Sequence, residues 1–271
     1  MSTGMGYFFG AQRTWQGWAG WHWLTLLHTI VGTGLIASGT AALNQWMERE
    51  ADAKMRRTQA RPLPAGRLGA GKALAFAIAI SAAGFGELWF GANLLCGLLG
   101  LFTLTLYLFV YTPLKQRSPH STTVGSIPGA MPPLIGFAAA SGTLTWDAWI
   151  LFAILLLWQF PHFYAIAWMY KEDYARAGIR MLPVVEPDGA STARRILLYS
   201  AALIPISLMP KFFAMAGNVY LYGALALGLA FLYYGLRIRT HRTRHQARRV
   251  LLASVVYLPV LFSLMLIDRP A

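Results

Sequence analysis

The sequence contains few charged residues and a single cysteine. Only 12% of its 271 residues are charged, whereas roughly 25% are charged in an ordinary soluble domain. Cys96 stands alone, which excludes an internal disulfide and a cysteine metal cluster. Acidic residues are especially scarce, because 10 Asp and Glu stand against 23 Lys and Arg, giving a formal net charge of +13. This composition argues against a water-soluble fold.

The sequence has long apolar segments in place of charge, and 56% of its residues are hydrophobic. About 20 helical residues cross the roughly 30 Å of hydrocarbon in a bilayer. Open sheets are excluded, because lipid cannot satisfy their edge groups. We therefore predict an all-α integral membrane protein with eight complete spans in a single domain, residues 1–271. The spans are expected near residues 22–45, 70–88, 93–112, 122–141, 148–170, 194–214, 218–237 and 250–267.

The basic residues are confined to alternate joints between these spans. Of the 23 cations, 20 lie in four joints that share one side of the predicted membrane, at residues 49–72, 115–117, 171–195 and 237–249. The positive-inside rule places that side in the cytoplasm and the C-terminus outside. The confinement favours a multi-pass protein of a bacterial-type inner membrane over a nucleic-acid-binding protein, and the last arginine run is expected to meet anionic lipid head groups.

Seven of the ten acidic residues lie in two of these basic joints or at the span ends leading into them. Asn44, Glu48 and Asp52 recur every four residues, so on a continuous helix their oxygen-bearing side chains form one stripe. Hard oxygen ligands without His or Cys suit Mg²⁺, which shares its coordination shell with substrate phosphates. Arg57 and Arg61 follow closely and are suited to binding phosphate oxygens through paired hydrogen bonds. Together these residues predict a diphosphate site.

A plainer interpretation stands beside each acidic group. The stripe would pair with basic side chains on the same solvated helix end, namely Arg49, Lys54 and Arg56. The second group, residues 170–178, offers Asp173 as a further metal ligand, although position 177 carries no carboxylate. Glu172 would equally well form an ion pair with Arg176. On a continuous helix His162 would share a face with Asp173.

Several motifs resemble the UbiA-type intramembrane prenyltransferases. The stripe from Asn44 to Asp52, followed by Arg57-Thr-Gln-Ala-Arg61-Pro-Leu-Pro, is similar to the first motif of that family. Later motifs resemble its haem-modifying branch, the protoheme IX farnesyltransferases or haem O synthases. These are Tyr111-Thr-Pro-Leu-Lys115, residues 125–136, Trp158-Gln-Phe-Pro-His162-Phe, residues 171–178 and Met181-Leu-Pro183. The similarity runs in order through residues 20–190, and the last 80 residues match only in hydropathy and charge.

The resemblance implies a nine-helix bundle with a cavity open to the cytoplasm. Residues 1–20 would then be the remnant of a truncated first helix and an outer loop, with a flexible outer tail as the alternative. Family members usually begin with a full helix, so we expect that the start was assigned too late and that a chain made from residue 1 is unstable or inactive. Family members also usually have Asp where Glu48 stands.

The implied reaction moves the farnesyl group of farnesyl diphosphate to the 2-vinyl group of haem b, with addition of water, giving haem O and diphosphate. Mg²⁺ is the implied cofactor. The resemblance assigns metal binding and catalysis to Asn44, Glu48, Asp52 and Asp173, diphosphate binding to Arg57, Arg61, Lys115, Arg117 and Lys171, and haem binding to His162 and Trp158. Besides the two substrates and the bilayer, a haem A synthase or an oxidase-assembly protein is a candidate partner.

Other interpretations stay open at this point. The same prenyl donor would serve a phenolic or quinone precursor, although the segment around His162 argues against that acceptor. A multi-span transporter would line a two-sided path with ionisable groups, whereas the acids here cluster on one side. His162 itself would also suit a buried hydrogen bond to a neighbouring span. The glycines and prolines of residues 122–141 predict a bent span, explained by tight helix packing or by an approaching haem.

Overall fold

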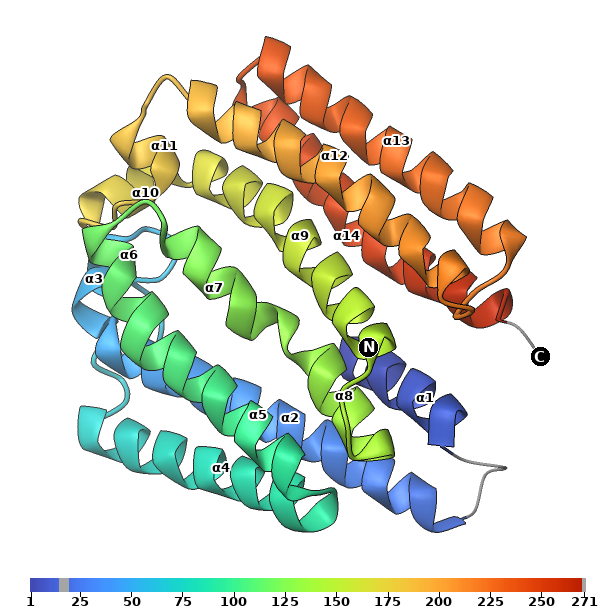
Figure 1. The fold of residues 1–271 in the computed structure, drawn as a ribbon. Helices are drawn as coiled ribbons and strands as arrows, with labels where there is room; N and C mark the ends of the chain where they lie inside the picture. The colour runs from blue at the N-terminus through green and yellow to red at the C-terminus, as the bar shows by residue number, and fades with distance from the viewer. Residues whose placement is uncertain (15–19, 270–271) are drawn as a thin grey trace. The chain divides into compact units, whose positions relative to one another are not determined.

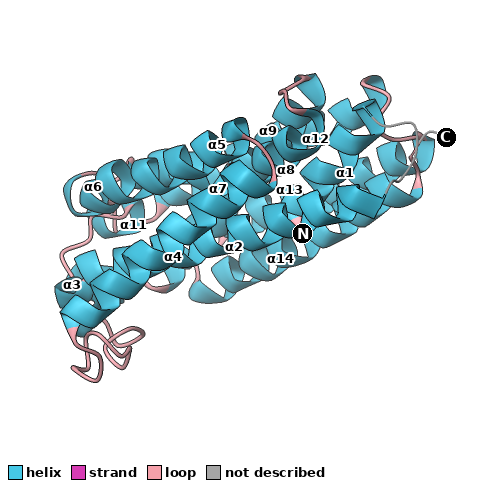
Figure 2. Ribbon diagram, turned by 90° about the horizontal axis from the view of Figure 1, so that it is seen from below, coloured by secondary structure: helices cyan, strands magenta, loops and turns pink. Residues whose placement is uncertain are grey.

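The computed structural model describes residues 1–14 and 20–269, so part of the segment 1–20, expected to hold the first-helix remnant and an outer loop, lies outside the described residues. All regular elements within the described residues are helices (Figures 1 and 2). The chain divides into two compact units. The first comprises Met1–Ala148 with Glu172–Arg180, and the second comprises Trp149–Lys171 with Met181–Ala271.

The first unit contains the N-terminal helices and the short helix α10. Its elements are α1 (Ser2–Thr14), α2 (Gly20–Met47), α3 (Arg49–Lys54), α4 (Ala70–Gly91), α5 (Leu94–Thr105), the π-helix η1 (Leu106–Tyr111), α6 (Thr112–Arg117), α7 (Ser121–Ala130), α8 (Pro132–Ser141) and most of α10 (Lys171–Arg176). Helix α2 packs along α4, where Gly39 faces Ser81 so closely that a Cβ on the glycine would overlap the serine hydroxyl. Such small-residue contacts are typical of helices packed in membranes.

Helix α1 packs against α8 through glycines on both helices. A Cβ added to Gly136 would overlap the carbonyl oxygen of Thr3, and one added to Gly6 would overlap the carbonyl oxygen of Pro133. The hydroxyl of Tyr7 donates to the backbone oxygen of His22 at 2.7 Å. Residues 2–14 therefore form a packed helix, and the expectation of a flexible outer tail is wrong. Of the two explanations for the glycines and prolines of residues 122–141, tight helix packing explains Gly136.

The expected span at residues 122–141 is two ten-residue helices and not one continuous helix. Helix α7 ends at Ala130 and α8 begins at Pro132, with Met131 between them. Pro132 and Pro133 have no amide hydrogen, so a continuous helix would lose two backbone hydrogen bonds here. The bend predicted from the prolines is thus a break between two helices.

The second unit consists of three long C-terminal helices together with α9. Its elements are α9 (Trp146–Met169), assigned to this unit from Trp149 on, α11 (Leu182–Val185), α12 (Ala190–Phe212), α13 (Asn218–Thr240) and α14 (Arg244–Ile267). Helix α13 packs against both α12 and α14. Helix α9 contacts α12 through the stacked rings of Phe160 and Tyr199, whose centroids are 3.9 Å apart. It contacts α14 through Trp158, whose Nε1 donates to the backbone oxygen of Ser254 at 2.8 Å.

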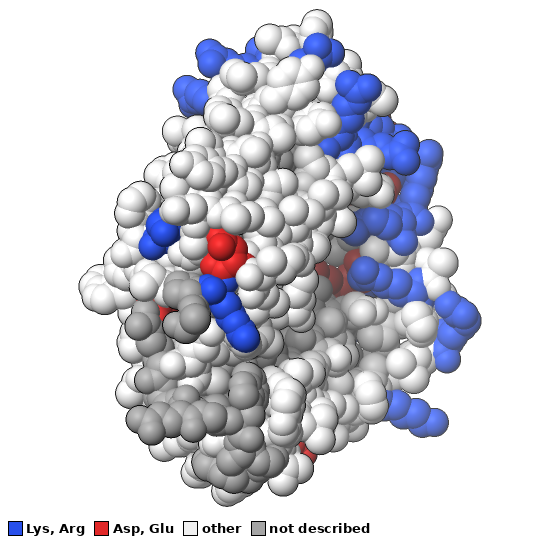
Figure 3. Space-filling view, turned by 90° about the vertical axis from the view of Figure 1, so that its right-hand side faces the viewer, with Lys and Arg blue, Asp and Glu red and all other residues white. Residues whose placement is uncertain are grey.

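Seven helices of the described chain are long and apolar enough to cross a membrane. They correspond to seven of the eight predicted spans, and the broken α7–α8 segment is the exception. Helix α9 is the most buried of the seven, with 56% of its apolar window inside the protein. On the face shown in Figure 3, large areas carry neither acidic nor basic side chains. The protein is therefore a multi-pass helical membrane protein.

The α1–α8 contact predicts a sharp difference between two glycine substitutions. Gly136→Ala should lower the free energy of unfolding by about 1–3 kcal/mol, because the new methyl group would force the two backbones apart. Gly4→Ala, also on this helix pair but with nothing within 4 Å of the added Cβ, should be neutral or slightly stabilising, since Ala favours a helix more than Gly does. The measurement is the thermal unfolding midpoint in detergent. Equal midpoints for the two variants would contradict this account of the contact.

Candidate active site

The predicted oxygen stripe is present and crosses the junction between α2 and α3. Helix α2 ends at Met47, yet the backbone hydrogen bonds continue, with Glu48 N donating to Asn44 O at 2.9 Å and Asp52 N donating to Glu48 O at 2.8 Å. The side chains therefore keep the four-residue spacing of a helix. Glu48 is 7% exposed and Asp52 is 2% exposed, so the stripe faces the interior of the unit.

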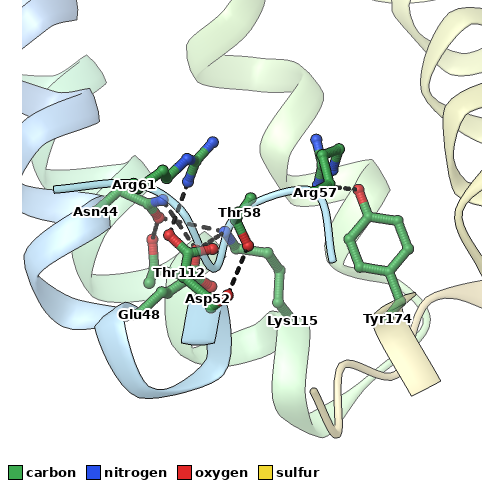
Figure 4. A network of polar contacts seen from close by, with 9 residues as sticks. All are labelled: Asn44, Glu48, Asp52, Arg57, Thr58, Arg61, Thr112, Lys115 and Tyr174. Carbon is green, nitrogen blue, oxygen red and sulfur yellow. Dashed lines mark hydrogen bonds and ion pairs between the residues drawn. The ribbon is translucent and has the colours of Figure 1, made fainter. Parts of the chain in front are cut away.

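Lys115 is the main cationic partner of the first two residues of the stripe. Its Nζ lies 2.6 Å from Glu48 Oε2 and 3.2 Å from Asn44 Oδ1 (Figure 4). Asn44 Nδ2 donates to the same Glu48 oxygen at 2.9 Å. The Lys115 side chain is buried. Because the pair is removed from water, its attraction is screened much less than that of a surface pair.

Arg61 binds the third residue of the stripe. Its Nη1 lies 2.7 Å from Asp52 Oδ2, and the hydroxyl of Thr58 donates to the Asp52 backbone oxygen at 2.8 Å. The segment after α3 thus folds back toward the stripe and places Arg61 against Asp52. Glu48 and Asp52 do not pair with basic side chains along a solvated helix end, so that plainer interpretation is wrong. Both carboxylates are buried, and they bind Lys115 and Arg61.

The π-helix η1 and the first residue of α6 contribute side chains to the network that sequence reasoning missed. Thr112 Oγ1 lies 2.8 Å from Asn44 Oδ1 and 3.0 Å from the Tyr107 backbone oxygen. Lys115 Nζ lies 4.8 Å from the ring centroid of Tyr111 and 6.0 Å from that of Tyr107, within the range of cation–π attraction. Pro113, a helix-disrupting residue inside an apolar run, was the available signal for irregular backbone here.

The second acidic group brings Asp173 and Tyr174 to the segment that follows α3. Asp173 Oδ1 accepts a hydrogen bond from the backbone N–H of Arg56 at 3.3 Å and one from Arg176. Arg57 Nη2 lies 3.4 Å from the hydroxyl of Tyr174. Arg176 therefore pairs with Asp173, and the alternative pairing with Glu172 is wrong.

The remaining predicted site residues lie elsewhere. Arg117 is an exposed residue at the end of α6. Lys171 belongs to the second unit, where its Nζ lies 4.4 Å from the ring centroid of Trp168. The condition for His162 and Asp173 to share a helix face is not met, because α9 ends at Met169 and α10 begins at Lys171.

His162 and Trp158 form a small polar group in the second unit. Their rings are stacked, with centroids 4.7 Å apart. His162 Nδ1 lies 2.8 Å from the hydroxyl oxygen of Ser254, and that hydroxyl lies 2.6 Å from the Leu251 backbone oxygen. A hydroxyl has one hydrogen to donate. Because a backbone oxygen only accepts, Ser254 donates to Leu251 and accepts from His162, which leaves His162 Nε2 as an unprotonated acceptor.

The oxygen stripe suits a hard cation. Within the described residues no group of three or more His, Cys, Asp or Glu side chains has the geometry of a metal site, and the predicted carboxylates are bound by Lys115, Arg61 and Arg176. Glu48 Oε1, however, is buried without a hydrogen-bond partner in the described chain. A buried carboxylate oxygen without a partner is costly, and next to Asn44 it is the kind of ligand that Mg²⁺ takes. The donor set therefore fits the metal, and the assignment of its four ligands stays a prediction.

The comparisons with known proteins identify the family. The model of the UbiA prenyltransferase family matches residues 2–260 of this chain. The chain belongs to this family. Among the curated members it resembles, the "Protoheme IX farnesyltransferase" of Solibacter usitatus is 65% identical over 100% of this chain and 94% of that protein. The protein of the same name from Koribacter versatilis is 47% identical over 99% of this chain and 88% of that protein.

Solved structures of UbiA-type proteins share the fold. A structure described as digeranylgeranylglyceryl phosphate synthase matches with a TM-score of 0.80 at 15% identity, over 98% of this chain and 91% of the other. A UbiA homolog from Archaeoglobus fulgidus bound to DMAPP and Mg²⁺ matches with a TM-score of 0.63 at 15% identity, over 98% of this chain and 94% of that chain. The fold agrees with the family match, and as a member of that family the protein is a UbiA-type intramembrane prenyltransferase and not a transporter.

The Glu48–Lys115 pair predicts a compensating double substitution. Lys115→Met should lower the free energy of unfolding by about 3–5 kcal/mol, because it leaves a buried carboxylate without its cation. Adding Glu48→Gln removes that charge and should restore most of the lost stability. The measurement is a double-mutant cycle on thermal or denaturant unfolding in detergent. A double variant that is less stable than Lys115→Met alone would contradict the pairing.

Proposed function

We propose that this protein transfers the farnesyl group of farnesyl diphosphate to the 2-vinyl group of haem b. The observation that carries the proposal is the 65% identity, over the whole chain, to a relative named protoheme IX farnesyltransferase. Haem b, farnesyl diphosphate and water are consumed, and haem O, diphosphate and one proton are released. The carbon–oxygen bond at farnesyl C1 breaks, and a carbon–carbon bond to the vinyl group forms.

The network around Glu48 and Lys115 is the proposed diphosphate end of the site. Breaking the bond at C1 leaves negative charge on the diphosphate, so catalysis needs cations fixed in advance around the leaving group. Lys115 and Arg61 bind the stripe, and Arg57 lies on the same loop as Arg61, beside Tyr174. In our proposal all three donate to the diphosphate oxygens. Mg²⁺, when bound, would add positive charge at the leaving group. Asn44, Glu48, Asp52 and Asp173 would hold the metal.

The charge balance of the network explains why it suits this ligand. Without substrate, the buried carboxylates Glu48 and Asp52 are each compensated by a basic side chain. A diphosphate together with Mg²⁺ brings an anion for the basic side chains and a cation for the carboxylates. Exchanging one set of partners for the other keeps every buried charge compensated, which avoids the large cost of an unpaired charge in the interior. Arg117 and Lys171 are proposed as outer diphosphate contacts.

The allylic end of the substrate needs stabilisation of positive charge without a strong nucleophile. The rings of Tyr107 and Tyr111, which already lie near the Lys115 ammonium, offer π-faces for this purpose. An alkene carbon of haem attacks C1 directly, so no general base is required to activate the acceptor. Water then adds to the carbon next to the porphyrin ring and loses one proton, which produces the hydroxyl group of haem O.

His162 and Trp158 are proposed to bind haem b. The hydrogen bond to Ser254 holds the imidazole as the tautomer with hydrogen on Nδ1, which leaves the Nε2 lone pair available. Neutral imidazole nitrogen is a common haem iron ligand, and the second nitrogen fixes the ring orientation. Trp158, stacked on the imidazole and bound to the Ser254 backbone, restricts the ring further. His162 would thus bind the iron while the vinyl group reacts.

The proposed location is a bacterial inner membrane. The basic and acidic ends of the helices would face the cytoplasm and the C-terminus would lie outside, as the distribution of Lys and Arg over the joints favours. Farnesyl diphosphate, as an anion, would then reach its site from the cytoplasm. Contact with a haem A synthase or an oxidase-assembly protein is proposed as the route by which the product leaves.

The decisive experiment is direct detection of the product. Membranes containing the protein are incubated with haem b, farnesyl diphosphate and Mg²⁺, and the extracted haems are analysed by mass spectrometry. We expect a hydroxyethylfarnesyl adduct that is absent without Mg²⁺ or without the diphosphate. If this adduct does not form and a phenolic acid offered in place of haem is prenylated, the proposed acceptor would be an aromatic compound and not haem.

Two neighbouring acids give a matched test of the stripe. Asp52→Ala should lower product formation by about 100-fold or more, since it removes a ligand and releases Arg61 from its position. Glu50→Ala is the control, because the Glu50 side chain is 86% exposed and should leave turnover near that of the unchanged protein. Both variants are first compared by thermal unfolding. Equal rates for the two variants would remove Asp52 from the proposed site.

Haem binding tests the second unit separately from turnover. His162→Ala should weaken haem b binding and change the Soret absorption, because an axial iron ligand is lost. Ser254→Ala should retain the imidazole but show an intermediate effect, since the tautomer is no longer fixed. His245→Ala, at an exposed position on α14, is the control. An unchanged Soret spectrum in His162→Ala would show that the iron is not bound there.

A further inference from the structure

A groove runs between α13 and α14 in the second unit. Its volume is about 340 Å³, and it is open on one side. The lining is apolar apart from Arg249 and the two tyrosines, and comprises Leu227, Ala230, Phe231, Tyr234, Arg249, Leu252, Ala253, Val256 and Tyr257. Ala230 and Ala253 have short side chains, so the two helices leave a hollow where they face the groove. None of the residues proposed for the diphosphate or haem sites lines it.

The groove has a polar end and an apolar end. Tyr234 stands six residues before the end of α13 at Thr240, and Arg249 stands five residues after the start of α14 at Arg244. At 1.5 Å per residue, both lie roughly 8–9 Å along their helices from the arginine-rich turn. Leu227 and Tyr257 lie about 20 Å from the same turn by that rise. The apolar part therefore extends about 10 Å beyond Arg249 toward the middle of the membrane.

The arginine-rich turn has far more positive charge than the described chain neutralises. Six arginines lie between residues 237 and 249. Within the described residues only Arg242 has an acidic partner, Asp188, at 3.9 Å. Arg237 lies three residues beyond Tyr234, hence on the same side of α13, and its Nε has no hydrogen-bond partner in the described chain. This end of the groove is therefore electropositive and attracts anions.

The open side of the groove is apolar and lies along helices that cross the membrane. Leu252 and Val256 are 54% and 57% exposed, which is the surface that lipid chains cover in a bilayer. An occupant must therefore combine a hydrocarbon chain with an anionic head. We infer that this groove binds one anionic phospholipid, with an acyl chain between α13 and α14 and its phosphate held by Arg249.

The arrangement distinguishes this occupant from general lipid contact. A flat helix surface meets many lipids that exchange freely, whereas a groove with a cation at one end fixes both the chain and the head group. Basic side chains at a membrane surface attract anionic lipids over neutral ones, and Arg249 places that attraction at the level where the groove begins. Farnesyl diphosphate shares the chemistry of a chain and a phosphate, so the experiment must separate the two.

The test is native mass spectrometry on the full chain after delipidation in detergent. Phosphatidylglycerol and phosphatidylcholine with identical acyl chains are added separately, and retained lipids are counted. We expect one retained phosphatidylglycerol, favoured over phosphatidylcholine by about fivefold or more. Arg249→Gln and Ala253→Phe, which remove the cation and fill the groove, should each abolish this preference or the binding itself. Excess farnesyl diphosphate should not displace the lipid.

Two control variants keep the inference falsifiable. Arg239→Gln removes an exposed arginine of the same turn, and Val255→Phe adds bulk to α14, but neither residue lines the groove. Both should retain phosphatidylglycerol as the unchanged protein does. If Arg239→Gln and Arg249→Gln lose phosphatidylglycerol equally, the binding depends on the overall positive charge of the turn, and the proposed site is wrong. Equal retention of the two lipids, unaltered retention in Ala253→Phe, or displacement by farnesyl diphosphate would overturn it as well.

Discussion

The buried ion pair between Glu48 and Lys115 is the constraint on which the rest of the first unit's site depends. It joins the end of α2 to α6, elements that are separated by more than 60 residues of sequence. Two charges in the interior are tolerable only when their remaining hydrogen-bonding capacity is also satisfied. Asn44 and the ring of Tyr111 contribute to this on the lysine side. Glu48 Oε1 has no hydrogen-bond partner in the described chain, so the network lacks a partner at this oxygen.

The same logic extends to the neighbouring acids. Asp52 is bound by Arg61 of the following loop, and Asp173 by Arg176 of its own helix and by the backbone N–H of Arg56. The loop after α3 therefore makes polar contacts with both Asp52, through Arg61, and Asp173, through the Arg56 N–H. A site built in this way favours ligands that arrive as a pair of opposite charges, because exchange of partners then requires no uncompensated intermediate.

The sequence predicted much of this, and the missing parts have clear physical reasons. The spans and the oxygen stripe follow from local periodicity, which a single helix determines. Lys115 was assigned to the diphosphate from the family motif, but its contact with Glu48 depends on packing between distant elements, which spacing cannot reveal. Thr112 was missed because its direction depends on a π-helix, and the break at Met131 because prolines in a membrane helix bend some helices and divide others. The end of α9 at Met169 was predicted, because the charged segment after Tyr170 ends the apolar run.

The π-helix η1 has a further consequence for how this region tolerates a change of chain length. A π-turn accommodates one additional residue within otherwise regular helix, so it absorbs a change of chain length without displacing the helix after it. Loss of a single residue between Leu106 and Tyr111 would convert the turn to α-helix and leave α6 joined in a regular ladder. Deletion of one residue is therefore most easily accepted at this point, immediately before the lysine that binds the stripe. Elsewhere in α5 the same change would rotate every later side chain by about 100°.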